Sequence, residues 1–321
     1  MDDFRSPRWL PGGHTQTIWP ALFSRRFEGT APSFRRERWV TPDADFVDVD
    51  WLGTDRSAPL LVLFHGLEGS SASHYAQAFA AEAARRGWRF AIPHFRGCSG
   101  EINIAPRAYH SGDHAEIAWM LGRFRALHDG PMVAVGASLG GNALLRHAEE
   151  AGLTAAHELR ALAAISAPLD LAAGADAIGR GFGRQVYTRM FMRTMTRKAF
   201  VKLAQHPGLF DAARMRAARD LREFDDIFTA PLHGFASADD YYARASAGPQ
   251  LHRIRMPALV INARNDPFLP AHALPGAGEV GPHVTLWQPG HGGHVGFAGG
   301  RWPGHIGALP TRVTEWLAAH L

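Results

Sequence analysis

A short stretch near the middle of the chain, residues 132–142, constrains the fold more than any other. Its β-branched run at residues 133–135 predicts a buried strand, and residues 143–150 are compatible with a helix. Between them, residues 136–140 read Gly-Ala-Ser-Leu-Gly and fit the pattern Gly-x-Ser-x-Gly. Such a sharp turn strains its central residue and leaves no space for a Cβ two residues to either side. We therefore expect Ser138 to be an exposed candidate nucleophile at a strand end; the alternative is a serine that merely caps a helix.

Strand and helix signals alternate along much of the chain. Apolar runs of strand length end in glycine-rich or polar loops. The strands expected from this pattern are residues 38–40, 46–51, 59–64, 88–93, 159–165, 257–262 and 283–288, and the helices are residues 73–86, 113–127 and 311–321. Such alternation with short turns is typical of a doubly wound α/β domain. We expect a mostly parallel sheet flanked by helices, preceded by an irregular arm over residues 1–35, which prolines and glycines interrupt.

The alternation stops at Pro168. From residue 170 to residue 249 helical runs dominate and no buried strand is evident, whereas strand signals resume at residue 257. We interpret residues 1–169 and 250–321 as one α/β core and residues 170–249 as a helical cap inserted into it. A cap at this point of the chain would lie over the carboxyl ends of the strands, where open α/β sheets bind ligands.

Composition excludes several functional classes. Cys98 is the one cysteine in 321 residues, so the chain cannot form an intramolecular disulfide or a zinc site built from several cysteines. The first residues are acidic, and no window has enough apolar residues to cross a bilayer, so neither secretion nor an integral membrane segment is predicted. The net charge of +4 comes from arginines scattered along the chain. We expect a cytoplasmic protein that binds no nucleic acid.

A serine nucleophile needs a base, and the base needs a carboxylate to orient it. Asp266 follows the strand at residues 257–262, and His294 follows the strand at residues 283–288 in a glycine-rich loop. Taken singly, these residues could be an aspartate in a turn before proline and an ordinary loop histidine. Their order after Ser138 and their positions at strand ends favour a catalytic triad. His291 competes with His294 for the role of base.

Acyl transfer also needs two backbone N–H groups aimed at the developing oxyanion. Leu139, directly after the serine, is placed to supply one of them. Leu67 follows His65 and Gly66 at the end of an earlier strand and is placed to supply the other. The alternative for residues 65–66 is a plain turn, and we expect His65 to fix the loop and to transfer no proton.

The motifs together resemble those of one known family, the YheT-like branch of the α/β-hydrolase superfamily, which is related to the eukaryotic ABHD esterases. The matching segments cover almost the whole chain and are residues 12–17, 65–70, 94–101, 109–113, 136–142, 262–268 and 292–297. The resemblance implies the α/β-hydrolase fold and assigns the family's serine, aspartate and histidine to Ser138, Asp266 and His294. The family often has two acids where this chain has Asn265 and Asp266, so only the second can serve. Its membrane-anchored members carry an apolar N-terminal segment that this sequence lacks.

The resemblance implies a serine esterase that cleaves carboxylic esters through an acyl-enzyme, with no metal and no organic cofactor. Its partner would be a small-molecule or lipid ester, because relatives act on simple esters, acylglycerols and phospholipids or transfer acyl groups to alcohols. Two alternatives stay open at this point. One is an acyltransferase that passes the acyl group to an alcohol, and the other is a non-catalytic binding protein, against which the intact triad argues. The oligomeric state is not predicted.

The predicted cap contains an apolar stripe. Tyr187, Phe191 and Met195 recur every four residues and would share one face of a helix, with arginines 189, 193 and 197 roughly opposite. An apolar stripe usually belongs to a core. A cap over the strand ends would instead turn this stripe towards Ser138, and we expect it to form the acyl pocket, so that substrate choice depends on the cap.

Overall fold

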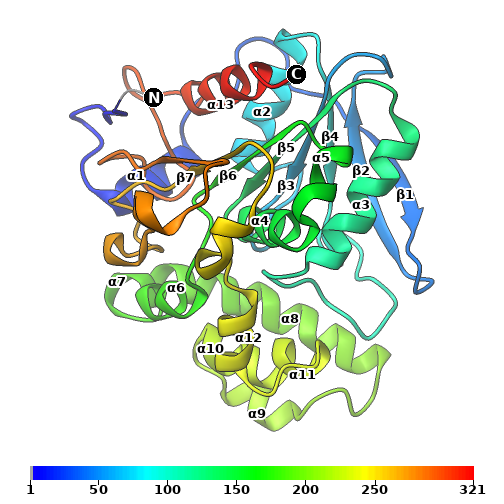
Figure 1. The fold of residues 1–321 in the computed structure, drawn as a ribbon. Coiled ribbons are helices and arrows are strands. Elements are labelled where there is room, and N and C mark those ends of the chain that lie inside the picture. The colour runs from blue at the N-terminus through cyan, green and yellow to red at the C-terminus, as the bar shows by residue number, and fades with distance from the viewer. Residues whose placement is uncertain (1–2) are drawn as a thin grey trace.

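Eight strands form a single sheet at the centre of the computed structural model, which describes residues 3–321 (Figure 1). The strands are β1 (Arg35–Val40), β2 (Phe46–Leu52), β3 (Leu60–Phe64), β4 (Arg89–Pro93), β5 (Met132–Ala137), β6 (Ala161–Ile165), β7 (Ala258–Ile261) and β8 (Val284–Trp287). Their order across the sheet is β1-β2-β4-β3-β5-β6-β7-β8. β2 runs antiparallel to both of its neighbours, and the other neighbouring pairs are parallel. The predicted mostly parallel sheet is therefore confirmed.

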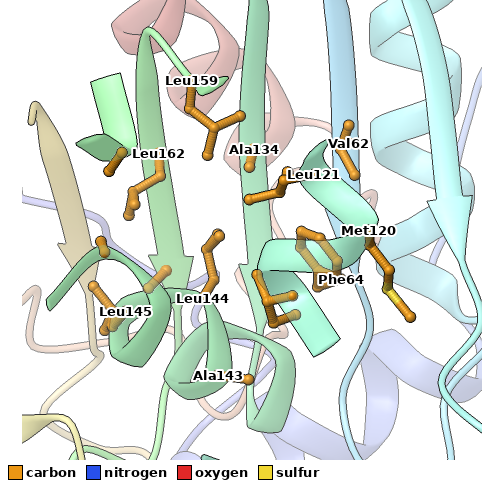
Figure 2. Packing of buried hydrophobic residues seen from close by; sticks show 14 of the residues in the cluster. Val62, Phe64, Met120, Leu121, Ala134, Ala143, Leu144, Leu145, Leu159 and Leu162 are labelled. Atoms are coloured by element: carbon orange, nitrogen blue, oxygen red, sulfur yellow. The ribbon is translucent and has the colours of Figure 1, made fainter. Parts of the chain in front are cut away.

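Helices cover both faces of the sheet, which explains why its central strands are apolar throughout. On one face, α3 (His114–Leu127) and α4 (Leu139–Ala151) pack against Val62 and Phe64 of β3 (Figure 2). On the other face, α2 (His74–Arg85) and α13 (Ala308–Ala318) pack against Leu61 and Leu63. Successive side chains of a strand point to opposite faces of the sheet, and helices cover both faces. All positions of these strands are therefore apolar. A short helix, α5 (Ala155–Glu158), lies between α4 and β6.

The prediction of an irregular arm over residues 1–35 is wrong in part, because residues Gly13–Leu22 form helix α1. Pro20 lies inside this helix and has no N–H to donate to the carbonyl of Gln16, a loss that disfavours a helix locally. Tertiary packing compensates. Gln16 and Thr17 are buried, and the carbonyl oxygen of Gln16 lies so near the loop before α13 that a Cβ on Gly296 would be 1.8 Å from it. Contacts with distant residues thus stabilise a helix that its own sequence disfavours.

The segment between β6 and β7 is helical. It contains α6 (Leu171–Ile178), α7 (Gly181–Gly183), a π-helical turn (Arg184–Thr188), α8 (Arg189–Gln205), α9 (Ala212–Ala217), α10 (Leu221–Phe224), a second π-helical turn (Asp225–Thr229), α11 (Ala230–Leu232) and α12 (Ala238–Ala245). Figure 1 shows these helices gathered below the sheet, away from the two chain termini. Two features tie them to the core: the side-chain N–H groups of Asn142 on α4 donate to the carbonyl of Ala245 at 2.8 Å, and its amide oxygen accepts the N–H of Ala247 at 3.0 Å.

Candidate active site

Ser138 lies between β5 and α4 in the strained geometry that the motif predicts. Its φ of 52° and ψ of −121° are unusual for a residue with a Cβ. The residues two positions before and after it must be glycines. A Cβ on Gly136 would lie 2.5 Å from the carbonyl oxygen of Gly140, and a Cβ on Gly140 would lie 2.4 Å from the carbonyl oxygen of Phe64. The Ser138 hydroxyl makes no hydrogen bond that caps α4. The turn therefore presents the hydroxyl away from the helix and leaves it available to another partner.

That partner is His294. The Nε2 atom of His294 lies 2.9 Å from Oγ of Ser138, and its Nδ1 atom lies 2.8 Å from Oδ2 of Asp266. The carboxylate of Asp266 is buried and its other oxygen accepts the N–H of Phe268 at 2.8 Å. Since Asp266 accepts at Nδ1, the neutral imidazole carries its proton there and offers a free electron pair at Nε2 to the serine hydroxyl. The three residues proposed from the sequence thus meet in one hydrogen-bonded chain.

The loop that bears His294 is held from several sides. Its backbone N–H donates to Oγ1 of Thr17 on α1 at 2.9 Å, and the N–H of Gly293 donates to Oδ1 of Asn265 at 3.1 Å. The imidazole stacks on Phe268 with ring centroids 4.0 Å apart and an angle of 15° between the planes. These backbone and ring contacts restrict the rotation of the imidazole, which favours proton transfer between His294 and Ser138.

Sequence reasoning assigned no role to Thr17, Asn265 or Phe268. All three lie in segments that carry the family resemblance, which was the available signal, but their partner in the fold is a loop that follows a different strand. His291, the competing histidine, is exposed, and within residues 3–321 no hydrogen bond or ion pair involves its side chain. Of the two histidines of the loop, His294 alone contacts Ser138 and Asp266 in the described part of the chain.

Two residues beside the serine have backbone N–H groups without a partner among the described residues. Within residues 3–321, the amides of Leu67 and Leu139 have no hydrogen-bond acceptor, and both residues line the same cavity as Ser138 and His294. Leu139 is the first residue of α4, where helical N–H groups lack partners and the helix dipole favours negative charge. Gly66 lets the earlier loop approach, since a Cβ there would lie 3.1 Å from Cβ of Ser138.

The loop that carries Leu67 is fixed by its neighbour Glu68, which has a φ of 57°. A non-glycine residue adopts this conformation at a cost, so other contacts must compensate. The hydroxyl of Tyr109 accepts the N–H of Glu68 at 2.9 Å and donates to its carboxylate at 2.9 Å. Lys198 of α8 donates to the same carboxylate oxygen at 2.8 Å. The loop that carries the Leu67 N–H is thereby connected to both the core and the helical segment.

His65 is completely buried beneath this loop. Its Nδ1 lies 2.8 Å from the carbonyl of Gly66, and its Nε2 accepts the N–H of Phe95 at 3.0 Å. Burial, with a smaller contribution from the charge of His94, lowers the pKa of His65 from 6.5 to about 3. A neutral imidazole that bonds to two backbone groups fixes the loop, in agreement with the role expected from the sequence.

We therefore expect the imidazole of His65 to stay neutral in the folded protein from pH 8 down to about pH 4. In the unfolded chain the pKa returns to 6.5, so below that pH the unfolded state binds a proton that the folded state does not bind until about pH 3. As the pH falls through this window, His65 should lower the free energy of unfolding by about 1.4 kcal/mol per pH unit. Imidazole chemical shifts in NMR spectra check the first statement, and urea unfolding of wild type and His65→Asn at several pH values checks the second. A folded-state midpoint near 6.5 would contradict the assignment.

A cavity of about 160 Å³ opens beside Ser138 and His294. Its walls from the core come from the loops that follow strands β3 to β8, so it lies at the carboxyl ends of the strands. Its apolar walls from the helical segment are Leu171, Ala175, Ile178, Phe191, Met195, Ala199, Leu221, Phe224 and Phe228. A mostly apolar space with a few polar side chains in its walls is the usual form of a site for a small organic ligand.

The stripe predicted for residues 187–195 is divided by the structure. Phe191 and Met195 line the cavity, whereas Tyr187 does not and instead lies with its hydroxyl 3.0 Å from Nδ1 of His14. Tyr187 belongs to the π-helical turn, whose wider spacing breaks the four-residue period of the stripe. Arginines 189, 193 and 197 are exposed, as the pattern predicts for the opposite face.

Within residues 3–321, no group of three or more His, Cys, Asp or Glu side chains is placed to hold a metal ion. No helix in this part of the chain combines the length and the apolar character that crossing a membrane requires.

Comparisons with known proteins agree with the geometry. A family model described as the alpha/beta hydrolase fold matches residues 59–300. YheT of Escherichia coli, provisionally named an esterase, is 40% identical over 99% of this chain and 94% of its own. Human phospholipase ABHD3 is 28% identical over 92% of this chain and 73% of its own. In fold, the chain is similar to mouse alpha/beta hydrolase domain-containing protein 10, with a TM-score of 0.56, 13% identity, and coverage of 89% of this chain and 99% of that one. It is also similar to an esterase of Pyrococcus furiosus, with a TM-score of 0.53, 15% identity, and coverage of 92% and 95%.

Proposed function

Because the chain belongs to the α/β-hydrolase family, in the branch that contains YheT, and is an esterase-type hydrolase, we propose that it cleaves carboxylic esters through an acyl-enzyme on Ser138. One observation carries this proposal: Oγ of Ser138, the imidazole of His294 and the carboxylate of Asp266 form a continuous hydrogen-bonded chain at the wall of an apolar cavity. This is the arrangement that activates a serine hydroxyl.

In the first half of the reaction, Oγ of Ser138 attacks the ester carbonyl carbon while Nε2 of His294 takes the hydroxyl proton. The carboxylate of Asp266 holds the imidazole in the required tautomer and stabilises the positive charge that it gains. When the tetrahedral intermediate collapses, the bond to the leaving alkoxide breaks and His294 returns the proton to that oxygen. The products are a free alcohol and an acyl group on Ser138.

In the second half, a water molecule replaces the alcohol. His294 removes a proton from the water as its oxygen attacks the acyl carbon, and the proton then passes to Oγ of Ser138 as the acid leaves. In both halves the carbonyl oxygen becomes negative and would be bound by the N–H groups of Leu67 and Leu139. Loss of one such donor typically costs about 2.7–4 kcal/mol of transition-state stabilisation. The contacts that hold Glu68 and the loop of Leu67 would therefore contribute to the reaction rate by keeping this donor in place.

We infer that residues 170–249 act as a cap and supply the acyl pocket. The support is that this segment contributes most of the apolar cavity wall, and that Ser138 lines the same cavity. Phe191 and Met195 also pack in apolar clusters, so they serve the stability of the segment as well as the pocket. An acyl chain would gain about 0.8 kcal/mol for each methylene that it buries there.

Substitution of Met195 by alanine should therefore move the preferred acyl length to a longer chain by roughly two carbons, because it lengthens the apolar space. Activity on acetate esters should change little, since a two-carbon acyl group stays near Ser138. The measurement is kcat/KM over a series of p-nitrophenyl esters. Met190→Ala is the matched control, because Met190 lies on the same helix and is exposed. Equal profiles for the two variants, with lower thermal stability for Met195→Ala alone, would assign Met195 to the core only.

Covalent labelling tests the proposed function as a whole. A fluorophosphonate probe should react with the native protein and, after digestion, be found on the peptide that contains Ser138. Denatured protein should not react, because a serine hydroxyl is a weak nucleophile without its base. A native protein that hydrolyses esters but carries no label at Ser138 would contradict the proposed nucleophile.

A further inference from the structure

Two segments far apart in the sequence carry an unusual combination of aromatic side chains and arginines. Residues 4–27 and 299–306 contain five arginines and no aspartate or glutamate. The structure brings them together, because Arg25 donates its N–H to the carbonyl of Gly304 at 2.9 Å and accepts the N–H of Ile306 at 3.0 Å. The end of α1 and the loop before α13 therefore lie side by side (Figure 1).

Large apolar side chains gather on this surface, which we call the Trp302 patch and define by Trp9, Trp19, Leu22, Phe23 and Trp302. Trp19 is at its centre, with ring centroids 5.8 Å from Trp9, 4.7 Å from Phe23 and 6.3 Å from Trp302. Trp302 is 69% exposed, Leu22 64% and Phe23 57%. Side chains of this size are seldom so exposed in one place unless the surface meets an apolar partner.

Hydrogen bonds fix two rings of the patch, whereas, within the described chain, the N–H of a third ring is free. The indole N–H groups of Trp9 and Trp19 donate to the carbonyls of Gly300 at 3.1 Å and Pro303 at 2.8 Å, which fixes both rings. The indole N–H of Trp302 has no acceptor within residues 3–321 and is free to donate to a partner. Tryptophan with one apolar side and one free N–H suits the boundary between water and lipid.

A set of unpaired cations accompanies the patch. Arg8, Arg25 and Arg301 are exposed, and no carboxylate within residues 3–321 lies in ion-pair distance of them. Because most other arginines of the molecule have a carboxylate partner or cover an aromatic ring, this absence gives the patch a positive potential. Exposed apolar side chains beside unpaired arginines match an anionic lipid surface, where the rings enter the interface and the guanidinium groups bind phosphates.

We propose that the Trp302 patch docks the protein on an anionic phospholipid surface. A second copy of the chain is a poorer occupant, because a symmetric dimer would place the patch against itself and bring its arginines together. The position of the patch also has a consequence for the site. Thr17, which accepts the His294 N–H, lies two residues before Trp19 on the same helix. A docked α1 would therefore hold the histidine loop close to the lipid, where ester substrates are concentrated.

Vesicle binding tests this proposal independently of ester cleavage. The 321-residue protein carrying Ser138→Ala is sedimented with vesicles of phosphatidylcholine alone, or with vesicles in which phosphatidylglycerol makes up about a third of the lipid. The protein should bind the anionic vesicles more tightly, the binding should weaken as salt is added, and the tryptophan emission should shift to shorter wavelength. In the same background, a Phe23→Ala, Trp302→Ala variant should bind roughly tenfold more weakly or worse. Arg25→Gln with Arg301→Gln should abolish most of the salt dependence.

Leu153→Ala is the matched control, because Leu153 is 76% exposed but lies between α4 and α5. It should bind vesicles like the parent protein. Absence of binding to anionic vesicles at low salt would overturn the proposal, and so would unchanged binding by the Phe23→Ala, Trp302→Ala variant. A dimer in solution that these two substitutions dissociate would assign the patch to a second copy instead. Failure of ester hydrolysis would leave the vesicle result unaffected, so the two proposals fail separately.

Discussion

Substitution of Ser138 by alanine should lower kcat for ester hydrolysis by about a millionfold and abolish covalent labelling, with the thermal stability unchanged. The expected size follows from the behaviour of serine nucleophiles that act together with a histidine, where removal of either leaves only the contribution of oxyanion binding. Alanine keeps the Cβ and fits the strained turn, and the hydroxyl makes no capping hydrogen bond that the fold would lose. The measurement is kcat with a short p-nitrophenyl ester, together with the fluorophosphonate reaction.

Ser166→Ala is an informative control for this experiment. Ser166 follows β6, also has a positive φ of 49°, and accepts the N–H of Val295 at 3.1 Å through its hydroxyl. It therefore resembles Ser138 in backbone conformation but supports the histidine loop without facing the nucleophile position. Ser166→Ala should therefore lower kcat far less than Ser138→Ala does. Residual labelling of Ser138→Ala at the wild-type level would exclude Ser138 as the nucleophile.

Substitution of His294 by alanine should reduce kcat by a similar factor, about a millionfold, because the serine hydroxyl then has no base and the leaving alkoxide has no acid. The variant should still fold, since the backbone contact of His294 with Thr17 uses its N–H and not its ring. Product formation under single-turnover conditions measures the loss directly.

His291→Ala belongs beside it as a control from the same glycine-rich loop. Its side chain is exposed and takes no part in the hydrogen-bonded chain of Ser138, His294 and Asp266, so kcat/KM of the variant should stay within a few-fold of wild type. If His291→Ala lost the larger part of the activity, the base and the orientation of the loop would both have to be reassigned.

Local sequence was sufficient where backbone geometry or side-chain period decides the structure. A run such as Leu60–Phe64 must be buried on both faces, which requires helices on both sides of a parallel sheet. The turn around Ser138 needs small residues at positions 136 and 140, because strand and helix backbones approach them. The helix predicted over residues 113–127 begins where expected, since the carboxylate of Asp113 accepts the N–H of Glu116 at the start of α3.

Contacts between segments distant in the sequence decided the rest. Helix α1 forms in spite of Pro20 because Gln16 and Thr17 are buried against the histidine loop. Tyr187 leaves the cavity wall because a π-helical turn alters the period of its stripe, and this turn depends on packing rather than on propensity.

The sequence by itself determined the order of the eight strands and of helices α2, α3, α4 and α13, the strained turn at Ser138, and the residues from which a nucleophile, a base and an acid could be chosen. Each of these follows from patterns within some ten residues. Only the tertiary structure decided that the ring of His294 lies within hydrogen-bond distance of Ser138, that Glu68, Tyr109 and Lys198 fix the loop that carries Leu67, and that the aromatic residues of the Trp302 patch meet on one surface. The physical reason is that these contacts are made between loops that follow different strands, or between helix α1 and the loop before α13. Such distances are set by how the sheet and its helices pack, which no local pattern encodes.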